Sequence, residues 1–203
     1  MSYYFTNDET LKSEVKKINV IINNLALSFY TDNGVFSKKG LDFGTRTLLE
    51  TLPPLKGDVL DIGCGYGPIG IYIAKKYDVN VDMVDVNLRS LDLALKNSLL
   101  NNVKTNVFES DLYSSITKKY DFIITNPPIR VGKDILYKLL FDAKNHLNKN
   151  GQLWLVVNKD QGAKSLFKDL SKEYETTVVC KNKGFFVIRA INNWHVDTNL
   201  IKL

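Results

Sequence analysis

The stretch DVLDIGCGYGPIG, residues 58–70, strongly limits the folds open to this chain. A short run rich in apolar and β-branched residues ends in three glycines at alternate positions, and a segment with helical spacing follows. Glycines permit a tight turn and allow a helix to start close to the strand that precedes it. A strand that turns directly into a helix is the start of a β–α–β unit, so we expect a parallel sheet.

The same alternation of strands and helices continues along the chain. The predicted strands cover 58–63, 79–86, 103–110, 120–126, 151–158, 176–181 and 184–190. The predicted helices cover 67–77, 88–102, 134–150 and 162–174. The amphipathic pattern of the second of these helices is carried by leucines spaced three and four apart, Leu88, Leu91, Leu95 and Leu99. We therefore expect an α/β fold, a doubly wound, mostly parallel sheet with helices on both faces.

The two ends of the chain depart from this pattern. Only Asn182 and Lys183 separate the last two predicted strands, which are expected to pair as an antiparallel hairpin. We expect the core to cover residues 57–191 and a C-terminal tail to cover 192–203. Residues 1–56 are expected to form an N-terminal extension that packs on this core and covers its site. Within the extension, LALSFYTDNGVF predicts a hairpin that turns at Asn33-Gly34, and LDFGTRTLLETL predicts a helix.

Composition indicates one globular domain with a mild basic excess. The chain has 203 residues, of which 44% are hydrophobic and 24% charged, and its net charge is +5. No apolar run approaches the roughly 20 residues that cross a membrane, and the N-terminus lacks the pattern of a secretory signal. Cys64 and Cys180 are too few for a disulfide framework. We expect a cytoplasmic protein with no membrane partner; the charge fits a nucleic-acid partner and a lysine-rich solvated surface equally well.

Ligands of open parallel sheets bind beyond the carboxyl ends of the strands, where the three glycines lie. Asp61 precedes Gly63, Gly65 and Gly67 and is still on the strand. A carboxylate beside the turn would repel a pyrophosphate by about 1 kcal/mol or more, so a cationic or zwitterionic ligand is favoured. A tight turn without any ligand is the alternative interpretation.

Two more acids follow the next two strands. Asp85 is placed to accept hydrogen bonds from both hydroxyls of a ribose. Its alternative role is a helix N-cap, which Asn87 fills better. Asp111 is placed to accept a hydrogen bond from an adenine amino group, or it forms part of a surface turn. Leu112 and Ile62 offer apolar contact to the adenine base.

The sequence TNPPIR, residues 125–130, ends the strand at 120–126. Because proline has no N–H and restricts the residue before it, Pro127 and Pro128 stop the strand and hold Asn126 extended. A carboxamide fixed in this way can accept a hydrogen bond from a planar amine. A rigid turn without function is the alternative.

Side chains around Asn126 suggest a nucleic-acid substrate. Ile129 and Phe36 are candidates for sandwiching a flipped base, although Phe36 also suits the core of the hairpin. Arg130 and Lys133 are placed for phosphates, or they belong to an exposed helix start.

Together these motifs resemble a class I S-adenosylmethionine-dependent methyltransferase of the small-domain type. DIGCGYGPIG is similar to its cofactor loop, and NPPIRVGK resembles in particular the small-subunit ribosomal RNA guanine-N2 methyltransferase family, in its single-domain members. YTDNGVFSKKGLDFGTRTLLE and QGAKSLFK are also similar to that family, so the resemblance covers about residues 30–190. It implies a Rossmann-like, seven-stranded sheet whose last strand is antiparallel.

The resemblance also implies roles for individual residues. The methyl donor would be S-adenosyl-L-methionine, with the glycine loop and Asp61 around its methionine part, Asp85 on the ribose and Asp111 near the adenine. The residues expected to bind it are Asp61, Gly63, Cys64, Gly65, Asp85, Val86, Asp111, Leu112 and Asn126. The catalytic residues would be Asn126 and Pro127, and the substrate would contact Asn126, Pro127, Pro128, Ile129, Arg130 and Phe36.

The resulting function is methylation of an exocyclic amine, guanine N2 of small-subunit ribosomal RNA or of an assembling ribosomal particle. The well-known bacterial enzyme of this family has two methyltransferase-like halves, whereas this chain has room for one. Any contribution of the second half to RNA docking would be absent from this protein or supplied in another way, for example by a second copy in a homodimer.

Three alternatives remain open. A protein glutamine amide presents almost the same geometry as guanine N2, so a protein N-methyltransferase is the main rival. A nicotinamide-dependent oxidoreductase is disfavoured by Asp61 and by NPPI. An RNA-binding module with a vestigial cofactor site is disfavoured by the full set of acids and glycines.

Overall fold

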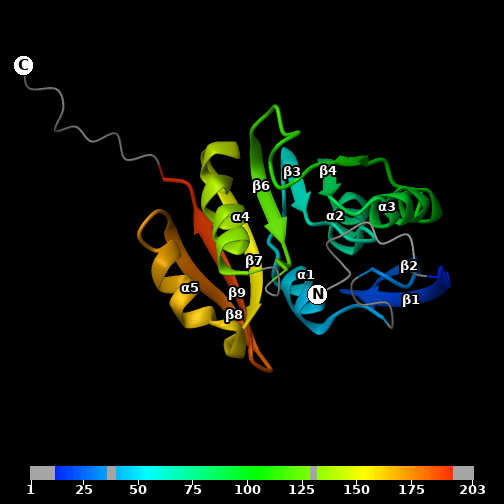
Figure 1. Ribbon diagram of the computed structural model, residues 1–203, viewed down its shortest axis with the longest axis horizontal. Helices are drawn as coiled ribbons and strands as arrows, with labels where there is room; N and C mark the ends of the chain where they lie inside the picture. The colour runs from blue at the N-terminus through cyan, green and yellow to red at the C-terminus, as the bar shows by residue number, and fades with distance from the viewer. Residues whose placement is uncertain (1–11, 36–39, 129–131, 194–203) are drawn as a thin grey trace, which may run out of the picture.

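The computed structural model describes residues 12–35, 40–128 and 132–193. Its main feature is a seven-stranded sheet in the order β5-β4-β3-β6-β7-β9-β8 (Figure 1). The strands are β3 (Asp58–Ile62), β4 (Asn80–Asp85), β5 (Asn106–Glu109), β6 (Tyr120–Thr125), β7 (Leu147–Asn158), β8 (Glu175–Asn182) and β9 (Phe185–Ile191). Neighbours from β5 to β7 pair in parallel, and β9 is antiparallel to both β7 and β8. The mostly parallel sheet with an antiparallel last strand is confirmed.

Helices cover both faces of this sheet (Figure 1). They are α1 (Phe43–Thr51), α2 (Pro68–Lys76), α3 (Leu88–Leu100), α4 (Lys133–His146) and α5 (Ala163–Leu170), with a 3-10 turn at Lys159–Gln161. Strand side chains alternate between the faces: Val59 belongs to the buried cluster that includes residues of α1, α2 and α3, and Leu60 to the one that includes residues of α4 and α5. Both faces of the central strands are therefore apolar, which explains their continuous hydrophobic runs.

The buried face of α3 differs from the predicted leucine stripe. Leu91 is 7% exposed, but Leu88, Leu95 and Leu99 are 53%, 49% and 77% exposed. The residues that α3 buries are instead mostly small or polar, namely Ser90, Leu91, Leu93, Ala94, Asn97 and Ser98. The leucine prediction is wrong for three of four positions, because the neighbour of this helix is partly a strand edge with polar backbone groups.

That neighbour is a second, two-stranded sheet formed by β1 (Lys16–Ile22) and β2 (Leu25–Thr31). The strands are antiparallel and turn at Asn23-Asn24, whose φ angles are 47° and 64°. The hairpin does not turn at Asn33-Gly34 as predicted; these two residues form a separate turn after β2, where Gly34 has a φ of 84°. Asparagine tolerates the left-handed region better than most residues, and two consecutive left-handed residues suit the twist of a two-residue hairpin.

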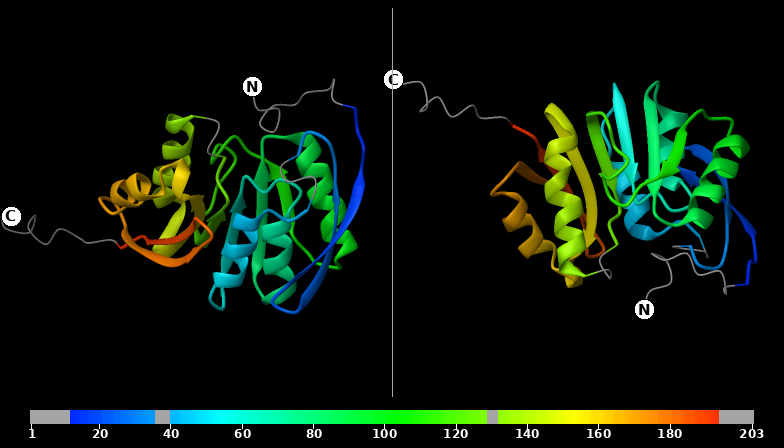
Figure 2. Two further views of the ribbon diagram at one scale, coloured as in Figure 1. Left: turned by 90° about the horizontal axis from the view of Figure 1, so that it is seen from below. Right: turned by 45° about the horizontal axis from the view of Figure 1, so that its top comes forward.

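The hairpin lies beside α3 (Figure 2) and is fastened to the core by Asn97 of this helix and by Asn101, its C-cap. The Asn97 side chain accepts from Tyr30 N at 2.6 Å and donates to Tyr30 O at 2.9 Å. Asn101 repeats this arrangement with Ser28, at 3.1 and 2.7 Å. Each amide thus pairs with the backbone of β2 as another strand would, which satisfies an edge that would otherwise be open. Asn97 also donates to Tyr66 O at 2.9 Å, so the hairpin is connected to the glycine loop.

Helix α4 ends at His146, four residues before the predicted end at Asn150-Gly151. Strand β7 begins at Leu147, and Asn150 has a φ of 62° within it. Asn150 N donates to Asn192 O at 3.0 Å, and Asn192 N donates to Gly151 O at 2.9 Å. These two hydrogen bonds join the residue that follows β9 to the first part of β7. In the described ranges, no helix combines the length and the apolar character needed to cross a bilayer.

Candidate functional site at the switch point of the sheet

The candidate site lies where strands β3, β4 and β6 end. The chain builds the sheet outward from β3 to β5 and then returns to the other side of β3 with β6, so β3 and β6 form the switch point at which such sheets bind ligands. The ends of the two strands are joined directly, because Thr125 Oγ1 donates to Ile62 O at 2.8 Å. This bond places Asn126 beside the glycine loop.

All three glycines of the loop adopt left-handed φ angles, 72° at Gly63, 55° at Gly65 and 91° at Gly67. Backbone N–H groups of Gly63 and Cys64 both donate to Val84 O at 2.9 Å, which ties the loop to β4. A Cβ at Gly67 would lie 2.9 Å from Ile71 Cδ1, whereas one at Gly63 or Gly65 would meet no atom within 4 Å. The first two glycines therefore line open space that a ligand can occupy.

Asp61, two residues before Gly63, is fully buried. Its Oδ2 accepts from Gly70 N at 2.8 Å, and its Oδ1 has no hydrogen-bond partner in the described structure. Burial raises the pKa of this carboxyl to about 7, the Gly70 bond opposes the rise, and the charge of Asp85 adds to it. A buried carboxylate oxygen without a partner is costly unless a ligand satisfies it.

Asp85 lies at the end of β4, and its carboxylate is bonded by the backbone on both sides. Oδ2 accepts from Gly65 N and Oδ1 accepts from Asn87 N, each at 2.9 Å. Burial raises the pKa of Asp85, and these backbone bonds lower it. The N-cap of α3 is Asn87, which accepts from Ser90 N at 3.0 Å, as expected. A backbone hydrogen bond from Val86 also reaches the Asp85 carboxylate and lowers its pKa.

Asp111 and Leu112 follow β5 at the same end of the sheet. Ser110 N donates to Asp85 O at 3.1 Å, which brings their loop next to the Asp85 strand. Asp111 is exposed and opens a turn in which its carbonyl accepts from Ser114 N at 3.0 Å. Leu112 has a φ of 51° and is partly exposed, as is Val86 at the end of β4.

Cys64 is buried within the loop, and burial raises the pKa of its thiol well above the ordinary value. Its Sγ lies 3.5 Å from Gly65 O. A thiol held in this form is a poor nucleophile, so Cys64 acts as a small packing residue.

The carboxamide of Asn126 is held by two residues that the sequence did not single out. Its Nδ2 donates to Asp42 Oδ2 at 3.0 Å and to Thr45 Oγ1 at 2.9 Å. Asp42 is the N-cap of α1 and also accepts from Thr45 N at 2.9 Å. An aspartate just before a helical stretch is a helix-start signal in the sequence, but nothing in it indicated a contact with Asn126.

The rest of the TNPPIR segment is described only in part. Pro127 is buried and Pro128 is partly exposed. Ile129, Arg130 and Phe36 lie outside the described residues, so their proposed contacts with substrate stay predictions.

Cations and rings gather at the start of α1, next to Asp42. The rings of Phe43 and Phe185 are 5.7 Å apart, and Lys183 Nζ lies 5.2 Å from the centre of the Phe43 ring. Lys159 N donates to Gly184 O at 2.7 Å, which places a second lysine at this turn. No carboxylate in the described part of the chain lies within ion-pair distance of Lys159 or Lys183.

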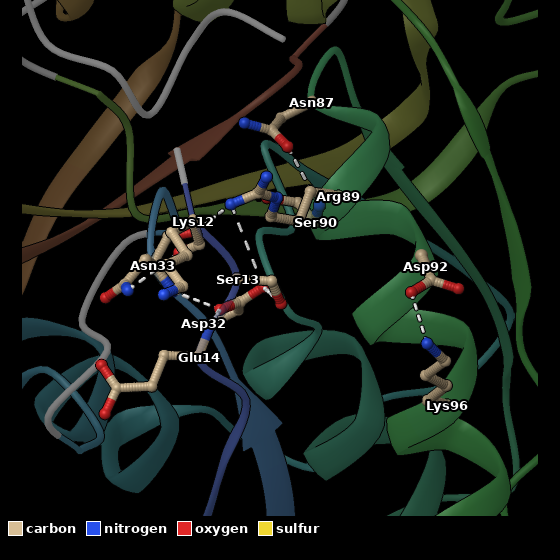
Figure 3. Close-up of polar contacts among 10 residues, drawn as sticks. All are labelled: Lys12, Ser13, Glu14, Asp32, Asn33, Asn87, Arg89, Ser90, Asp92 and Lys96. Atoms are coloured by element: carbon tan, nitrogen blue, oxygen red, sulfur yellow. Dashed lines mark hydrogen bonds and ion pairs between the residues drawn. The ribbon is translucent and has the colours of Figure 1, made fainter. Parts of the chain in front are cut away.

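A polar cluster around Asp32 anchors the segment that leads from the hairpin toward Phe36 (Figure 3). Burial opposes ionisation of Asp32, but hydrogen bonds from Ser13, Glu14 N and Asn33 N outweigh it and hold its pKa below the ordinary value. Arg89 Nη1 donates to Asn33 O at 2.8 Å and lies 4.0 Å from Asp32 Oδ2. The segment is thereby fixed to the first turn of α3, four residues beyond Asp85.

Comparison with known proteins identifies relatives along most of the chain. The methyltransferase small domain family model matches residues 26–189. The uncharacterized protein YbxB of Bacillus subtilis is 37% identical over 195 residues, which cover 93% of this chain and 97% of that protein. Ribosomal RNA small subunit methyltransferase C of Haemophilus influenzae is 36% identical over 173 residues, or 82% of this chain and 52% of that protein. The chain thus spans about half the length of the curated ribosomal RNA methyltransferases it matches.

A solved structure extends the similarity to three dimensions. The 16S rRNA N2 G1207 methyltransferase of T. thermophilus, in complex with AdoMet and guanosine, superposes with a TM-score of 0.80 at 27% identity. The match covers 90% of this chain and 52% of that one.

Proposed function

The chain belongs to the methyltransferase small-domain family, whose methyl donor is S-adenosylmethionine, and we propose that it methylates guanine N2 of small-subunit ribosomal RNA. It is a methyltransferase by family. The finer assignment to guanine N2 is the proposal, and it depends on the geometry of Asn126 and on the charges around it.

Residues at the ends of β3 and β4 suit the proposed donor. S-adenosylmethionine supplies an electrophilic methyl group when bound. The partnerless Oδ1 of Asp61 would accept from its amino group, in the space that Gly63 and Gly65 leave open. Asp85 would accept from the ribose hydroxyls, and the adenine would lie near Asp111, Leu112 and Val86 on the neighbouring strand ends.

The observation that carries the proposal is the engagement of the Asn126 amide. Both N–H groups of Nδ2 have acceptors in Asp42 and Thr45, while the described residues offer its Oδ1 no hydrogen bond. An amide whose NH2 is occupied presents its oxygen as an acceptor, the group needed to bind an N–H of an amine.

This oxygen would activate the substrate amine by orientation. The lone pair of guanine N2 is conjugated with its ring and poorly available. If Asn126 Oδ1 accepts one N–H and the Pro127 carbonyl accepts the other, that lone pair is directed at the methyl group. The same two oxygens stabilise the positive charge that develops on nitrogen in the transition state. Pro127 and Pro128 stiffen the loop, so the acceptors are in place before substrate arrives.

The charges at the mouth of the site favour RNA over protein. Lys183 is held over Phe43, one residue from Asp42, and Lys159 is fixed to the same turn. Lysines without carboxylate partners suit phosphodiester groups, and their effect on affinity should decrease as salt increases. Arg130 and Lys133 would add to this set, and Phe36 and Ile129 would enclose the base. A homodimer is proposed as the replacement for the half that the longer relatives contain.

Methyl transfer from tritiated S-adenosylmethionine tests the proposal. The substrates are small ribosomal subunits from a strain that lacks this gene and, separately, a glutamine-containing ribosomal protein. We expect label in RNA, released on nuclease digestion as N2-methylguanosine, and none with Asn126→Ala. Label in the protein fraction would assign the site to a glutamine amide instead. Transfer to neither would reject both assignments.

A further inference from the structure

We propose that Asp42 and Thr45 are positioning residues that fix which end of the Asn126 carboxamide faces the substrate. This inference rests on the proposed role of Asn126 as the acceptor for the substrate amine. Asp42 and Thr45 would not touch the substrate; they would act by holding the amide in one of its two possible orientations.

Hydrogen-bond chemistry determines the orientation. An ionised carboxylate oxygen only accepts, so Asp42 Oδ2, at 3.0 Å, must face the NH2 group of Asn126 and not its oxygen. The Thr45 hydroxyl lies 3.5 Å from the same Asp42 oxygen and can direct its hydrogen there, which leaves its lone pair for the second N–H of Asn126 at 2.9 Å. Two acceptors thus serve the two amide protons.

A rotated amide would be strongly disfavoured. Rotation by 180° would place Asn126 Oδ1 against the Asp42 carboxylate, where neither oxygen has a proton to donate, and would leave at most a bond from the Thr45 hydroxyl. It would also present N–H groups to the substrate, where an acceptor is needed. Because the two ends of an asparagine amide have nearly the same shape, packing alone does not distinguish them, and polar partners must do so.

The local fold holds Asp42 in place for this role. Its side chain caps α1 through Thr45 N at 2.9 Å, and its carbonyl accepts from Arg46 N at 2.9 Å. Gly44 makes the arrangement possible, since a Cβ there would lie 2.8 Å from the Phe185 ring and 3.0 Å from Asp42 Oδ2. The start of α1 therefore packs so closely against the start of β9 that position 44 has no room for a side chain.

Substitutions can separate positioning from helix capping. Asp42→Ser keeps a good N-cap but is too short to reach Asn126, and Asp42→Asn keeps both the cap and an acceptor. Thr45→Val removes the hydroxyl, whereas Thr45→Ser retains it. Thr51→Val is the matched control, because the Thr51 hydroxyl bonds only within α1, to Thr47 O at 2.7 Å.

We expect Asp42→Ser and Thr45→Val to lower kcat by about 10- to 100-fold, which corresponds to about 1.4–2.7 kcal/mol at 1.36 kcal/mol per tenfold. The Kd for S-adenosylmethionine should stay within a few fold. Asp42→Asn and Thr45→Ser should lose much less, and Thr51→Val should match the wild type. Wild-type kcat in Asp42→Ser would overturn the inference.

Side-chain amide NMR provides a readout that needs no substrate. In ¹⁵N spectra the NH2 pair of Asn126, assigned by its absence from Asn126→Ala, should be shifted and protected from exchange, and Asp42→Ser should return it to the values of free amides. An exposed, unshifted pair in the wild type would refute the inference. If the pair behaves as expected but no RNA is methylated, the positioning contact stands and the proposed RNA function fails.

Discussion

The affinity for S-adenosylmethionine should depend on pH through Asp61. Its carboxyl is fully buried, and burial raises its pKa to about 7 in the free protein, far above the ordinary value of about 3.9. Below pH 7 the free protein therefore holds a proton on Asp61. If the ammonium of the donor pairs with Oδ1, binding must release that proton, because a cation at hydrogen-bond distance favours the charged carboxylate.

Linkage gives the sign and the size of this effect. Below pH 7 the affinity should weaken by up to about tenfold for each unit of pH, so Kd at pH 5.5 should be about 25-fold larger than at pH 7.5. The stability of the free protein has the opposite dependence. Because the folded pKa is raised, the contribution of Asp61 to stability is present below about pH 4 and is lost as the pH rises through about 7.

Titration calorimetry at pH 5.5, 6.5 and 7.5, in two buffers with different ionisation enthalpies, measures both Kd and the number of protons released. This range stays below the pKa of the donor's own amino group, near 7.7–8.0 for such groups. The variant Asp61→Asn should bind weakly with a flat profile and no proton release. Two results would show that the donor's ammonium does not bind Asp61. One is a wild-type Kd that stays constant within about twofold over this pH range, and the other is a pH dependence of Kd that is unchanged in Asp61→Asn.

Other expectations concern the cofactor loop and the hairpin. Asp85→Ala should weaken donor binding by about 1–3 kcal/mol in calorimetry, and an unchanged Kd would leave that acid a structural role only. Gly65→Ala should cost about 1–2 kcal/mol of stability in urea unfolding, because φ is 55° there, and should reduce donor affinity as its Cβ enters the open space. Asn97→Ala should lose about 2–4 kcal/mol of stability, since it leaves two partly buried backbone groups of Tyr30 unpaired; a loss under about 1 kcal/mol would contradict that role. Leu99→Ser should change stability by less than about 0.5 kcal/mol, because the Leu99 side chain is 77% exposed. Truncation of a leucine in the core would instead cost several kcal/mol.

The sheet and its switch point were predictable because their signals are local. Glycines after a β-branched run, acids at the ends of successive strands and prolines after Asn126 each act within a few residues. Strand order then follows from short connections and from the antiparallel hairpin at the end. Asp61, Asp85 and Asn126 could therefore be assigned to one end of the sheet before their distances were known.

The features that escaped prediction depend on partners far away in the chain. The pattern of leucines in α3 suggested a buried stripe, but Asn97 and Asn101 face the backbone of β2, and most of those leucines face solvent. Asp42 reads as a helix cap in the sequence, and its bond to Asn126 spans 84 residues. No local pattern carries information about such a pair.

A crystal structure of the protein with S-adenosylhomocysteine and guanosine would test the central claim most directly. We predict guanine N2 at about 3 Å from Asn126 Oδ1, with Nδ2 still bonded to Asp42 and Thr45. Guanosine bound elsewhere, or the Asn126 oxygen turned away from N2 toward the start of α1, would contradict the account.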